Sequence, residues 1–387
     1  CARGLDMSSK RTLLLLGAGP EQVEALRIAR ELGYRTVAFD NDAEAVGRSF
    51  ADSFVQVDLK NESALLGEAE LASPDGVFVH AAELAVEAAR VADFLGLPGL
   101  GVETAETATD KRLRIERLAS AGIATPGFDV LESSAPLEAW LERFEEYGFP
   151  RVVKPTNQAG ARGVVLIASP DDLRRYYAER GMFSSKQFVC EQVLEGVQLS
   201  TESVAVDRKV LHHAVALRHY DTTERYRPFF IEDGHSLPFS LSEGQRTAVE
   251  TVIERCFDVL GVSSGVLKGD LVIAPDGEVF VLEMAVRTSG GRFADTVVPL
   301  GTGVQILYPL IELAMGDSLS QDWFAPTRNI GVSQRFFLHE GACEVGRGPA
   351  IGRLVGRPGV SEWRLNEAMF AAGVLPDVQS HRDRLGY

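Results

Sequence analysis

Strand-like and helix-like segments alternate over residues 11–98, and this alternation limits the fold more strongly than any other feature of the chain. The apolar run Thr12–Leu16 ends in a glycine turn, and a segment with apolar residues at helical spacing follows it. Thr36–Phe39 and Gly76–His80 are typical of further strands, and the Ala-rich segment Glu83–Leu95 is typical of a helix. Strands that alternate with helices of this length indicate an α/β domain with a doubly wound parallel sheet.

The pattern changes near residue 107, where helices and antiparallel strand pairs replace the regular alternation. The clearest pair flanks Pro275-Asp276-Gly277, a sequence typical of a turn between two strands. We therefore expect an α+β region here, with a polar, loop-rich stretch at 218–241. Helices are predicted at Thr107–Ala121, Leu137–Tyr147, Asp171–Arg180 and Glu243–Leu260. Strands are predicted at Arg151–Lys154, Val164–Ala168, Gln187–Val193, Ser200–Val206, Val210–Leu217, Gly265–Ala274 and Glu278–Val286.

The composition excludes several classes of protein. The 387 residues are enough for two or three domains, and 45% of them are apolar, so the chain can form real cores. Acidic residues number 55 against 39 Lys and Arg, a net charge of −16, which argues against binding to nucleic acid. No apolar run approaches the roughly 20 residues that a membrane-spanning helix needs. The four cysteines show no metal-binding or redox spacing, which favours the reducing cytoplasm.

The two ends of the chain are the least informative parts. Residues 1–6 precede Met7 and show no apolar periodicity, and we expect them to be an added remnant, with the native chain starting at Met7. Cys1 is therefore left out of the chemistry. The region 340–387 is rich in Gly and Arg, and the sequence predicts no role for it.

A first candidate site lies after the first predicted strand. Gly17-Ala18-Gly19 follows this strand, and Asp40 ends the second one. In a dinucleotide-binding domain such glycines approach a pyrophosphate at a helix N-terminus, and such an acid binds the ribose. The third glycine of that motif is absent, because Gln22 stands in its place, and Glu21 would lie beside the phosphates. A structural turn is therefore the preferred interpretation, and a dehydrogenase is the alternative.

A second candidate combines a lysine with a loop of small residues. Lys154 ends a predicted strand, and the loop Asn157–Gly163 follows it. A lysine in this position can contact phosphate oxygens, and backbone N–H groups of the loop can cover them. The spacing is not that of a Walker A loop, since no Gly-Lys-Ser or Gly-Lys-Thr occurs here. The alternative is a surface hairpin with an ordinary lysine.

A third candidate consists of two acids on the predicted hairpin. Asp270 and Glu283 lie on neighbouring strands and are expected to point to one face, which suits Mg²⁺ that bridges phosphate oxygens. Arg287 follows four residues after Glu283 and can hold an anionic group through two hydrogen bonds. The alternative is a pair of solvated acids on an edge hairpin. It fits less well, because Glu283 follows the apolar run Val279–Leu282.

The order of these features is more specific than any one of them. A lysine, a second lysine with a glycine loop, a strand-end acid and two metal-binding acids follow one another. In this order the chain resembles the ATP-grasp superfamily of carboxylate–amine ligases, over nearly its whole length from Met7. The resemblance implies a Rossmann-like N-terminal domain at 7–106, a central lid region at 107–205 and a C-terminal domain at 206–387. It also implies that ATP binds between two antiparallel sheets.

The resemblance also implies a set of residues that bind the nucleotide. Lys111 and Lys154 match the two lysines that contact phosphates, and residues 157–163 match the mobile loop that covers them. A hinge at the end of a strand contacts adenine through Glu191 and the backbone after it. The implied ATP-binding set is Lys111, Lys154, Gly160, Arg162, Gly163, Glu191, Gln192, Val193 and Gln198.

One residue of this set and one residue of the loop depart from the pattern of the superfamily. The ribose-binding acid expected seven residues after Glu191 is Gln198, which can bond a hydroxyl group but adds no charge. The serine that often precedes the loop arginine is Ala161.

For the metal and the reaction, Asp270 and Glu283 match the ligands of Mg²⁺, with Mn²⁺ as a substitute. Arg287 matches the arginine near the transferred phosphoryl and acyl groups, so Arg287 and Lys154 are the implied catalytic residues. Ala285 stands where many members have an asparagine that helps to hold a second metal ion. The run from Glu283 to Arg287 instead resembles the branch that contains carboxyaminoimidazole ribonucleotide synthetase.

Two segments concern the substrate. Phe229–Pro238 resembles a segment of L-amino acid (dipeptide) ligases, and Glu232 and His235 would then face the substrate, although a lone histidine is commonly structural. Backbone N–H groups for a substrate carboxylate are expected after Arg287, at Ser289, Gly290 and Gly291, with a plain glycine turn as the alternative. The implied substrate set is Glu232, His235, Arg287, Ser289, Gly290 and Gly291.

The favoured function is the ATP-dependent ligation of a carboxylate to an amine, with an amino acid as one substrate. The carboxylate attacks the γ-phosphoryl group, an acyl phosphate forms, and the amine displaces phosphate, so the products are an amide, ADP and phosphate. One alternative is a purine-pathway or carboxylase-type ATP-grasp enzyme, and another is a non-catalytic nucleotide-binding protein. We expect small-molecule substrates, a cytoplasmic location, no nucleic-acid or membrane partner, and a homodimer as the default assembly.

Overall fold

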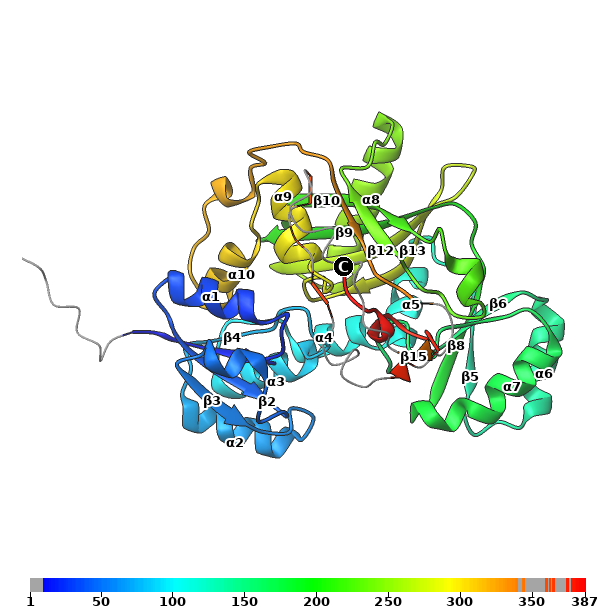
Figure 1. The fold of residues 1–387 in the computed structure, drawn as a ribbon, viewed down its shortest axis with the longest axis horizontal. Coiled ribbons are helices and arrows are strands. Elements are labelled where there is room, and N and C mark those ends of the chain that lie inside the picture. Colours follow the sequence, from blue (N-terminus) through cyan, green and yellow to red (C-terminus); the bar gives the residue numbers. More distant parts are fainter. Residues whose placement is uncertain are drawn as a thin grey trace, which may run out of the picture. The chain divides into compact units, whose positions relative to one another are not determined.

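The computed structural model describes residues 10–339, 343–344, 359–360, 362, 364–365, 374–375 and 377–387, and Figure 1 shows the order of their helices and strands. The residues before Lys10, which include Met7 and the expected remnant, lie outside this part of the chain. So does most of the Gly/Arg-rich C-terminal region. The last described strands before the C-terminus are β15 (Cys343–Glu344) and β16 (Val374–Leu375), which pair in antiparallel fashion.

The chain forms two compact units, each built from several of its stretches. Unit 1 contains the residues up to Thr125, Leu199–Ala216 and Leu237–Val332. Unit 2 contains Pro126–Gln198, Leu217–Ser236 and the C-terminal residues. The division at residues 106 and 205 that the family resemblance implies stays a prediction.

The first sheet lies in unit 1 and is parallel, as the sequence predicts. Its strands are arranged in the order β3 (Ser53–Gln56), β2 (Arg35–Asp40), β1 (Thr12–Leu16) and β4 (Gly76–Phe78). All three neighbouring pairs run parallel, with Leu13 opposite Thr36 in the pair of β1 and β2. Strand β3 was not predicted.

Helices cover both faces of this sheet. Alternate leucines of β1 belong to two different hydrophobic clusters, because successive side chains of a strand point to opposite faces. One cluster contains residues of α1 (Val23–Glu31) and α10 (Leu307–Ala314), and the other contains residues of α2 (Glu62–Ala72) and α3 (Ala85–Leu95). The predicted doubly wound arrangement is therefore confirmed, although helix α2 was not predicted.

The prediction of one helix over Thr107–Ala121 was wrong. The structure has two helices there, α4 (Val102–Thr109) and α5 (Lys111–Ser120). Asp110 between them has an extended backbone, and its carboxylate accepts hydrogen bonds from the N–H groups of Arg112 (2.9 Å) and Leu113 (3.0 Å). An aspartate that satisfies the first N–H groups of a helix is a strong N-terminal cap, and it starts a new helix here.

Unit 2 contains a four-stranded antiparallel sheet in the order β5 (Phe128–Glu132), β8 (Gln187–Gln192), β6 (Arg151–Pro155) and β7 (Val165–Ile167). Helices α6 (Leu137–Tyr147) and α7 (Pro170–Glu179) pack on it. Aromatic residues fill the space between them: Trp140, Phe144, Tyr176 and Phe188 are buried in one cluster. Strand β5 was not predicted, whereas α6 has the predicted bounds.

A six-stranded sheet has the order β13 (Val279–Ala285), β12 (Gly265–Ile273), β9 (Val197–Val206), β10 (Lys209–His219), β11 (Gly234–Leu237) and β14 (Val332–Arg335). The predicted hairpin is confirmed, since β12 and β13 are antiparallel partners. Helix α8 (Glu243–Leu260) packs against them and begins at a capping box, in which Ser242 and Gln245 bond each other's backbone N–H groups.

The segment 218–241, predicted to be a loop, contains strand β11 as well as a short 3₁₀ turn at Thr223–Tyr226. After β13 the chain forms a π-helical turn at Phe293–Val297 that continues into α9 (Val298–Thr302). Among the helices of the described residues, none combines the length and the apolar character needed to cross a membrane.

Candidate functional site

In unit 2, the structure brings together Lys154 and Glu191, which the sequence assigned to opposite ends of ATP. Lys154 lies on β6 and Glu191 on the neighbouring strand β8. Lys154 Nζ is 2.5 Å from Glu191 Oε2, and the two side chains are only 13% and 6% exposed. The lysine is therefore neutralised by the chain itself, and a phosphate group would have to take over this role from Glu191.

The predicted phosphate-covering loop is fixed at its base. Tyr176 donates a hydrogen bond from its hydroxyl to the carbonyl oxygen of Gly163, at 2.8 Å. A Cβ atom at Gly163 would lie 2.8 Å from the ring of Phe183 and from Pro155, and its φ of +69° also requires glycine. At Gly160, by contrast, a Cβ atom would meet nothing within 4 Å. Arg162 Nε donates to the carbonyl oxygen of Ala159 at 3.1 Å, so the loop tip turns back on itself.

The predicted adenine hinge lies at the end of β8. The N–H of Gln192 donates to the carbonyl oxygen of Gly127 at 2.8 Å, so this N–H already has a hydrogen-bond partner within the chain. Val193 follows directly after the strand, and Gln198 lies half-buried near the start of β9. Of the two predicted backbone contacts to adenine, the one from Val193 is therefore the better candidate.

In unit 1, the predicted metal ligands lie opposite each other on adjacent strands. Asp270 on β12 pairs in register with Glu283 on β13, and a β-bulge follows directly after Asp270. Asp270 is buried, while the Glu283 side chain keeps a third of its exposure. Residues that face each other in an antiparallel pair project to the same side of the sheet, so both carboxylates can serve one ion.

Basic side chains surround these two acids. Lys268 forms an ion pair with Asp270, and Arg114 Nη2 is 3.7 Å from Glu283 Oε1. Burial by itself would raise the pKa of Glu283, but the charges of Lys268, Arg114, Lys111 and Arg287 hold this pKa well below its ordinary value. Glu283 therefore stays ionised at neutral pH.

Lys268 and Arg114 were not among the predicted site residues, although their spacing from Asp270 and Lys111 indicates a shared face. Lys268 precedes Asp270 by two residues on one strand, which places both side chains on the same face. Arg114 follows Lys111 by three residues on α5, which places them on one side of the helix. Arg114 is buried and also donates to the carbonyl oxygen of Ala108 at 2.8 Å.

The donor set fits a magnesium ion that is bound together with phosphates. Among the residues that the structure describes, no group of three or more His, Cys, Asp or Glu side chains could hold a metal by itself. Mg²⁺ in nucleotide sites commonly takes one or two carboxylates and completes its shell with water and phosphate oxygens. The carboxylates of Asp270 and Glu283 match this requirement, and the cations around them match the negative charge of a polyphosphate.

Arg287, the predicted catalytic arginine, is paired with an acid that the sequence analysis did not single out. Its guanidinium donates to the carboxylate of Glu83, with Nε 2.7 Å from Oε1, and Nη1 donates to the carbonyl oxygen of Thr288 at 3.1 Å. Glu83 lies in the loop before α3, so no sequence spacing links it to Arg287. Arg287 therefore already binds a carboxylate, that of Glu83.

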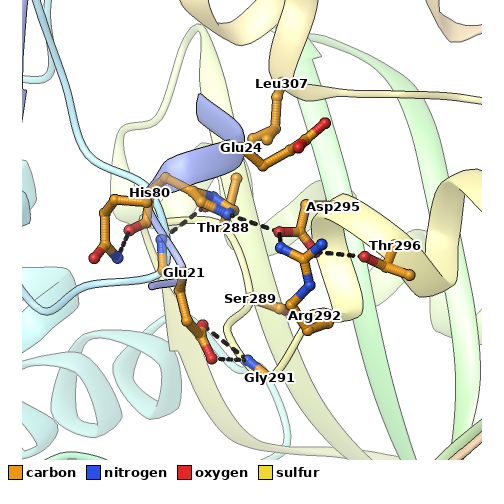
Figure 2. Close-up of polar contacts among 12 residues, drawn as sticks. Glu21, Glu24, His80, Thr288, Ser289, Gly291, Arg292, Asp295, Thr296 and Leu307 are labelled. Carbon is orange, nitrogen blue, oxygen red and sulfur yellow. Dashed lines mark hydrogen bonds and ion pairs between the residues drawn. The ribbon is translucent and has the colours of Figure 1, made fainter. Parts of the chain in front are cut away.

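The predicted N–H groups after Arg287 also bind carboxylates, but these belong to the chain. Ser289 N–H lies 3.2 and 3.1 Å from the two carboxylate oxygens of Glu202, and Gly291 N–H lies 3.0 Å from both oxygens of Glu21. Figure 2 shows the Glu21–Gly291 contact. At Gly290, a Cβ atom would lie 2.8 Å from Glu21 Oε2, so this close approach requires glycine.

Glu202 is a further residue that sequence reasoning missed. It lies in the middle of β9 and is fully buried. Burial raises its pKa to about 7, although the hydrogen bonds from Ser289 and the charges of Arg287 and Lys268 act in the opposite direction. A glutamate within an otherwise apolar and hydroxylic strand, Leu199–Val206, was the available signal.

The predicted substrate residues Glu232 and His235 form an ion pair with each other in unit 2, and both are buried. Arg218 Nη2 donates to Glu232 Oε2 at 3.3 Å, and Arg384 Nη2 donates to the carbonyl oxygen of Glu232 at 2.9 Å. Burial alone would raise the pKa of Glu232, but the neighbouring His235, Arg218 and Arg384 hold it well below its ordinary value. The structure brings the two residues together; their substrate role stays a prediction.

Other residues of the chain already contact the glycine turn after β1. Asp40 accepts a hydrogen bond from the N–H of Ala18 at 2.6 Å, and Gly47 donates to the carbonyl oxygen of Ala18 at 2.7 Å. The Gln22 side chain lies against both glycines of the turn, within 4 Å of where their Cβ atoms would be. These contacts agree with the interpretation as a structural turn.

Comparisons with known proteins point to one superfamily. The family model described as the D-ala D-ala ligase C-terminus matches residues 118–291. A D-alanine–D-alanine ligase from Cupriavidus necator is 28% identical over 218 residues, which cover 53% of this chain and 62% of that protein. The crystal structure of L-amino acid ligase from Bacillus licheniformis has a TM-score of 0.78 at 22% identity, over 92% of this chain and 87% of that one.

A further solved structure carries a nucleotide. N5-carboxyaminoimidazole synthetase from Staphylococcus aureus, complexed with ADP, has a TM-score of 0.67 at 17% identity and covers 81% of this chain and 79% of that chain. These comparisons show that the chain has the ATP-grasp fold.

The predicted fold class is thereby confirmed for this ATP-grasp chain: a parallel Rossmann-like sheet is accompanied by a four-stranded and a six-stranded sheet with antiparallel strand pairs. The chain spans less than two thirds of the length of the D-alanine–D-alanine ligase that it matches.

Proposed function

We propose that this ATP-grasp chain is an ATP-dependent carboxylate–amine ligase that forms a peptide-like amide bond and takes an amino acid as one substrate. The observation that carries the proposal is the pair of Asp270 and Glu283, which lie opposite each other and are surrounded by Lys111, Arg114, Lys268 and Arg287. Two carboxylates among four cations suit a metal-bound triphosphate better than a metal ion alone, because the triphosphate supplies the missing negative charge. The D-alanine and L-amino acid ligases among the similar proteins support an amino acid as the substrate class.

Each part of the nucleotide has matching residues. Glu191 and Val193 would contact adenine, Gln198 would bond the ribose, and Lys154 and Lys111 would neutralise the phosphates. The loop with Gly160, Arg162 and Gly163 would cover the phosphates with N–H groups. When ATP binds, Lys154 would exchange Glu191 for a phosphate oxygen, which leaves the Glu191 carboxylate available to the base.

Asp270 and Glu283 would hold the magnesium ion, which supplies charge neutralisation at the γ-phosphoryl group. Arg287 would orient the substrate carboxylate, whose oxygen attacks the γ-phosphorus while ADP leaves. The amine then attacks the acyl carbon of the acyl phosphate, loses a proton and expels inorganic phosphate. The chain contributes position and charge in both steps, so a nucleophilic side chain is not required.

Two sets of residues are candidates for holding the substrates. Glu232 and His235 are candidates for the amino group and carboxylate of an amino acid, and Ser289, Gly290 and Gly291 are candidates for an anionic group next to Arg287. Small-molecule substrates, a cytoplasmic location and a homodimer remain part of the proposal.

A second candidate is a purine-pathway or carboxylase-type reaction. The run Glu283–Arg287, which resembles carboxyaminoimidazole ribonucleotide synthetase, and the similar structure from Staphylococcus aureus favour it. In that case the carboxylate would be bicarbonate and the amine would carry a phosphorylated sugar.

An ADP-release assay tests these proposals. The purified chain is incubated with ATP, Mg²⁺ and pairs of amino acids, with bicarbonate plus a phosphorylated amine as a second arm, and the Lys154→Met variant as the inactive control. ADP release that requires both members of an amino-acid pair supports the ligase. Release that requires bicarbonate instead supports the second candidate, and nucleotide binding without release in any arm contradicts both.

A further inference from the structure

The segment Arg287–Arg292 follows β13 and carries the arginine on which the proposed reaction depends. Side chains from four other parts of unit 1 hold this segment, and each contacts a different residue of it. The pairs are His80–Thr288, Glu202–Ser289, Glu21–Gly291 and Asp295–Arg292. Figure 2 shows three of these pairs in one close-up. Three of these four side chains are acids, and the fourth is His80.

His80 lies just after β4, at the end of the parallel sheet, and is 1% exposed. Its Nδ1 is 2.7 Å from the hydroxyl oxygen of Thr288, and its Nε2 is 3.5 Å from Asp295 Oδ2. The carbonyl oxygen of His80 accepts a hydrogen bond from Gln22 Nε2 at 2.7 Å. Figure 2 shows the imidazole between Thr288 and Asp295. His80 is therefore anchored at its backbone and at both ring nitrogens.

The hydrogen-bond donors around this imidazole favour one tautomer. The N–H of Ala81 donates to the Thr288 hydroxyl oxygen at 3.1 Å, and the hydroxyl proton of Thr288 then points to His80 Nδ1. A neutral imidazole with an acceptor at Nδ1 carries its proton on Nε2, which faces the carboxylate of Asp295. In this arrangement the Thr288 hydroxyl bonds both His80 Nδ1 and the Ala81 N–H, and Nε2 faces Asp295.

The row of Thr288, His80 and Asp295 resembles a nucleophilic triad in its residue types, but its burial argues against that role. Thr288 is 0% exposed, and its hydroxyl oxygen lies among the backbone of Ala81 and the ring of His80. A nucleophile must reach its substrate, so a hydroxyl enclosed in this way can only position the residues around it.

We propose that His80 is a positioning residue for Arg287. Through the Thr288 hydroxyl it fixes the first residue after Arg287, and Arg287 in turn donates from Nη1 to the Thr288 carbonyl oxygen. The direction of the guanidinium thus depends on a hydrogen bond to the parallel sheet, which is rigid. The inference rests on the proposed function, in which Arg287 orients the substrate carboxylate. A displacement of about 1 Å at such a group can lower turnover roughly 100-fold.

Kinetics of Thr288→Val, Thr288→Ser and His80→Asn test this inference. Valine has the shape of threonine but no hydroxyl, whereas serine keeps the hydroxyl and asparagine keeps an acceptor close to the position of Nδ1. We expect Thr288→Val to raise the KM for the carboxylate substrate about tenfold or more and to change the KM for ATP less than about twofold. Thr288→Ser should restore both values, and His80→Asn should lie between the two variants.

Thr296→Val is the matched control. Thr296 donates from its hydroxyl to Asp295 Oδ1 at 3.1 Å, on the side of Asp295 away from His80, so this variant loses a similar hydrogen bond without changing the His80–Thr288 pair. Its two KM values should equal those of the unmodified chain. An equal rise of both KM values in Thr288→Val, or the same rise in Thr296→Val, would overturn the positioning role.

A spectroscopic measurement separates this inference from the proposed function. In protein with ¹⁵N-labelled histidine, the resonance that disappears in His80→Asn should report a neutral ring with its proton on Nε2, and Thr288→Val should shift it. A proton on Nδ1 would overturn the arrangement even if the ligase is active. If no carboxylate supports ADP release, the ligase proposal fails, while the histidine spectrum still decides the arrangement.

Discussion

Asp270 and Glu283 face each other across the antiparallel strands β12 and β13, and a lysine or an arginine approaches each of them. A cross-strand pair of acids would ordinarily repel, and the surrounding cations offset this repulsion. The surrounding cations hold the pKa of Glu283 well below its ordinary value, which favours metal binding at this carboxylate. A bound metal ion would add further positive charge to this cluster, which is why we expect the phosphates to bind together with the metal.

Substitution of these acids should change the magnesium requirement. Asp270→Asn and Glu283→Gln should each raise the Mg²⁺ concentration for half-maximal ADP release by about tenfold or more, since losses of this size follow from weaker metal coordination. Glu283 should be the more damaging position, because four surrounding cations act on its carboxylate. The measurement is a Mg²⁺ titration at saturating ATP, with Glu278→Gln, an exposed acid at the hairpin turn, as the control. Unchanged titrations in both variants would contradict the metal role.

Loss of Lys154 should abolish turnover. In Lys154→Met the phosphate contact is removed, and we expect kcat/KM for ATP to fall roughly 100- to 1,000-fold. Lys186→Met, which changes an exposed lysine of the same unit, should have no effect. Near-native activity of Lys154→Met at low ATP would show that the lysine does not bind phosphate.

The same lysine has a structural role that can be measured separately. Lys154→Met leaves Glu191 buried without its cation, which should lower the free energy of unfolding by about 3–5 kcal/mol. The double variant Lys154→Met, Glu191→Leu removes both charges and should recover most of this stability while remaining inactive. Denaturant unfolding of the three proteins measures the effect. A double variant as unstable as the single one would mean that the ion pair is not the cause.

The products should identify an acyl phosphate. Attack on the γ-phosphorus gives ADP and inorganic phosphate, whereas an adenylate would give AMP and pyrophosphate. Hydroxylamine in place of the amine should trap the activated carboxylate as a hydroxamate, and this should require ATP and Mg²⁺. Oxygen-18 in the carboxylate should appear in the released phosphate, because that oxygen bridges the acyl carbon and phosphorus. Label in AMP would contradict this route.

Glu202 should make stability depend on pH. Its pKa is raised to about 7 in the folded chain, so between the ordinary value near 4.5 and pH 7 the folded state binds more protons than the unfolded state. The free energy of unfolding should therefore fall as pH rises through this interval and level off above it, by roughly 2–3 kcal/mol in total. Glu202→Gln cannot ionise, and the difference between the two proteins in thermal unfolding from pH 4.5 to 8 isolates this contribution. Parallel curves would contradict it.

Most of the secondary structure could be predicted from the sequence, because apolar periodicity is a local property of the chain. The run Thr12–Leu16 and the hairpin around Asp276 were predicted almost residue by residue, since their patterns follow from burial on two faces and from turn geometry. The break at Asp110 was missed, because an N-cap depends on whether the chain leaves the helical conformation there, and the residues on both sides favour helix. Short elements such as β5 were missed because tertiary pairing, and not their own pattern, holds them.

The sequence by itself determined which residue types carry the chemistry. The order of Lys111, Lys154, Asp270, Glu283 and Arg287 along the chain was enough to indicate the superfamily and to predict ATP and Mg²⁺. These predictions need only the identity and the spacing of residues, which hydrogen-bonded strands and helices translate into faces and registers.

Only the tertiary structure decided which partners these residues have. Arg287 pairs with Glu83 across more than 200 positions of sequence, and His80 meets Thr288 across a similar separation. No periodicity links such residues, because their approach depends on how the parallel sheet and the β12–β13 hairpin pack within unit 1. Burial in that packing raises the pKa of Glu202, and neighbouring cations lower that of Glu283, so two glutamates of identical intrinsic chemistry acquire opposite charge behaviour.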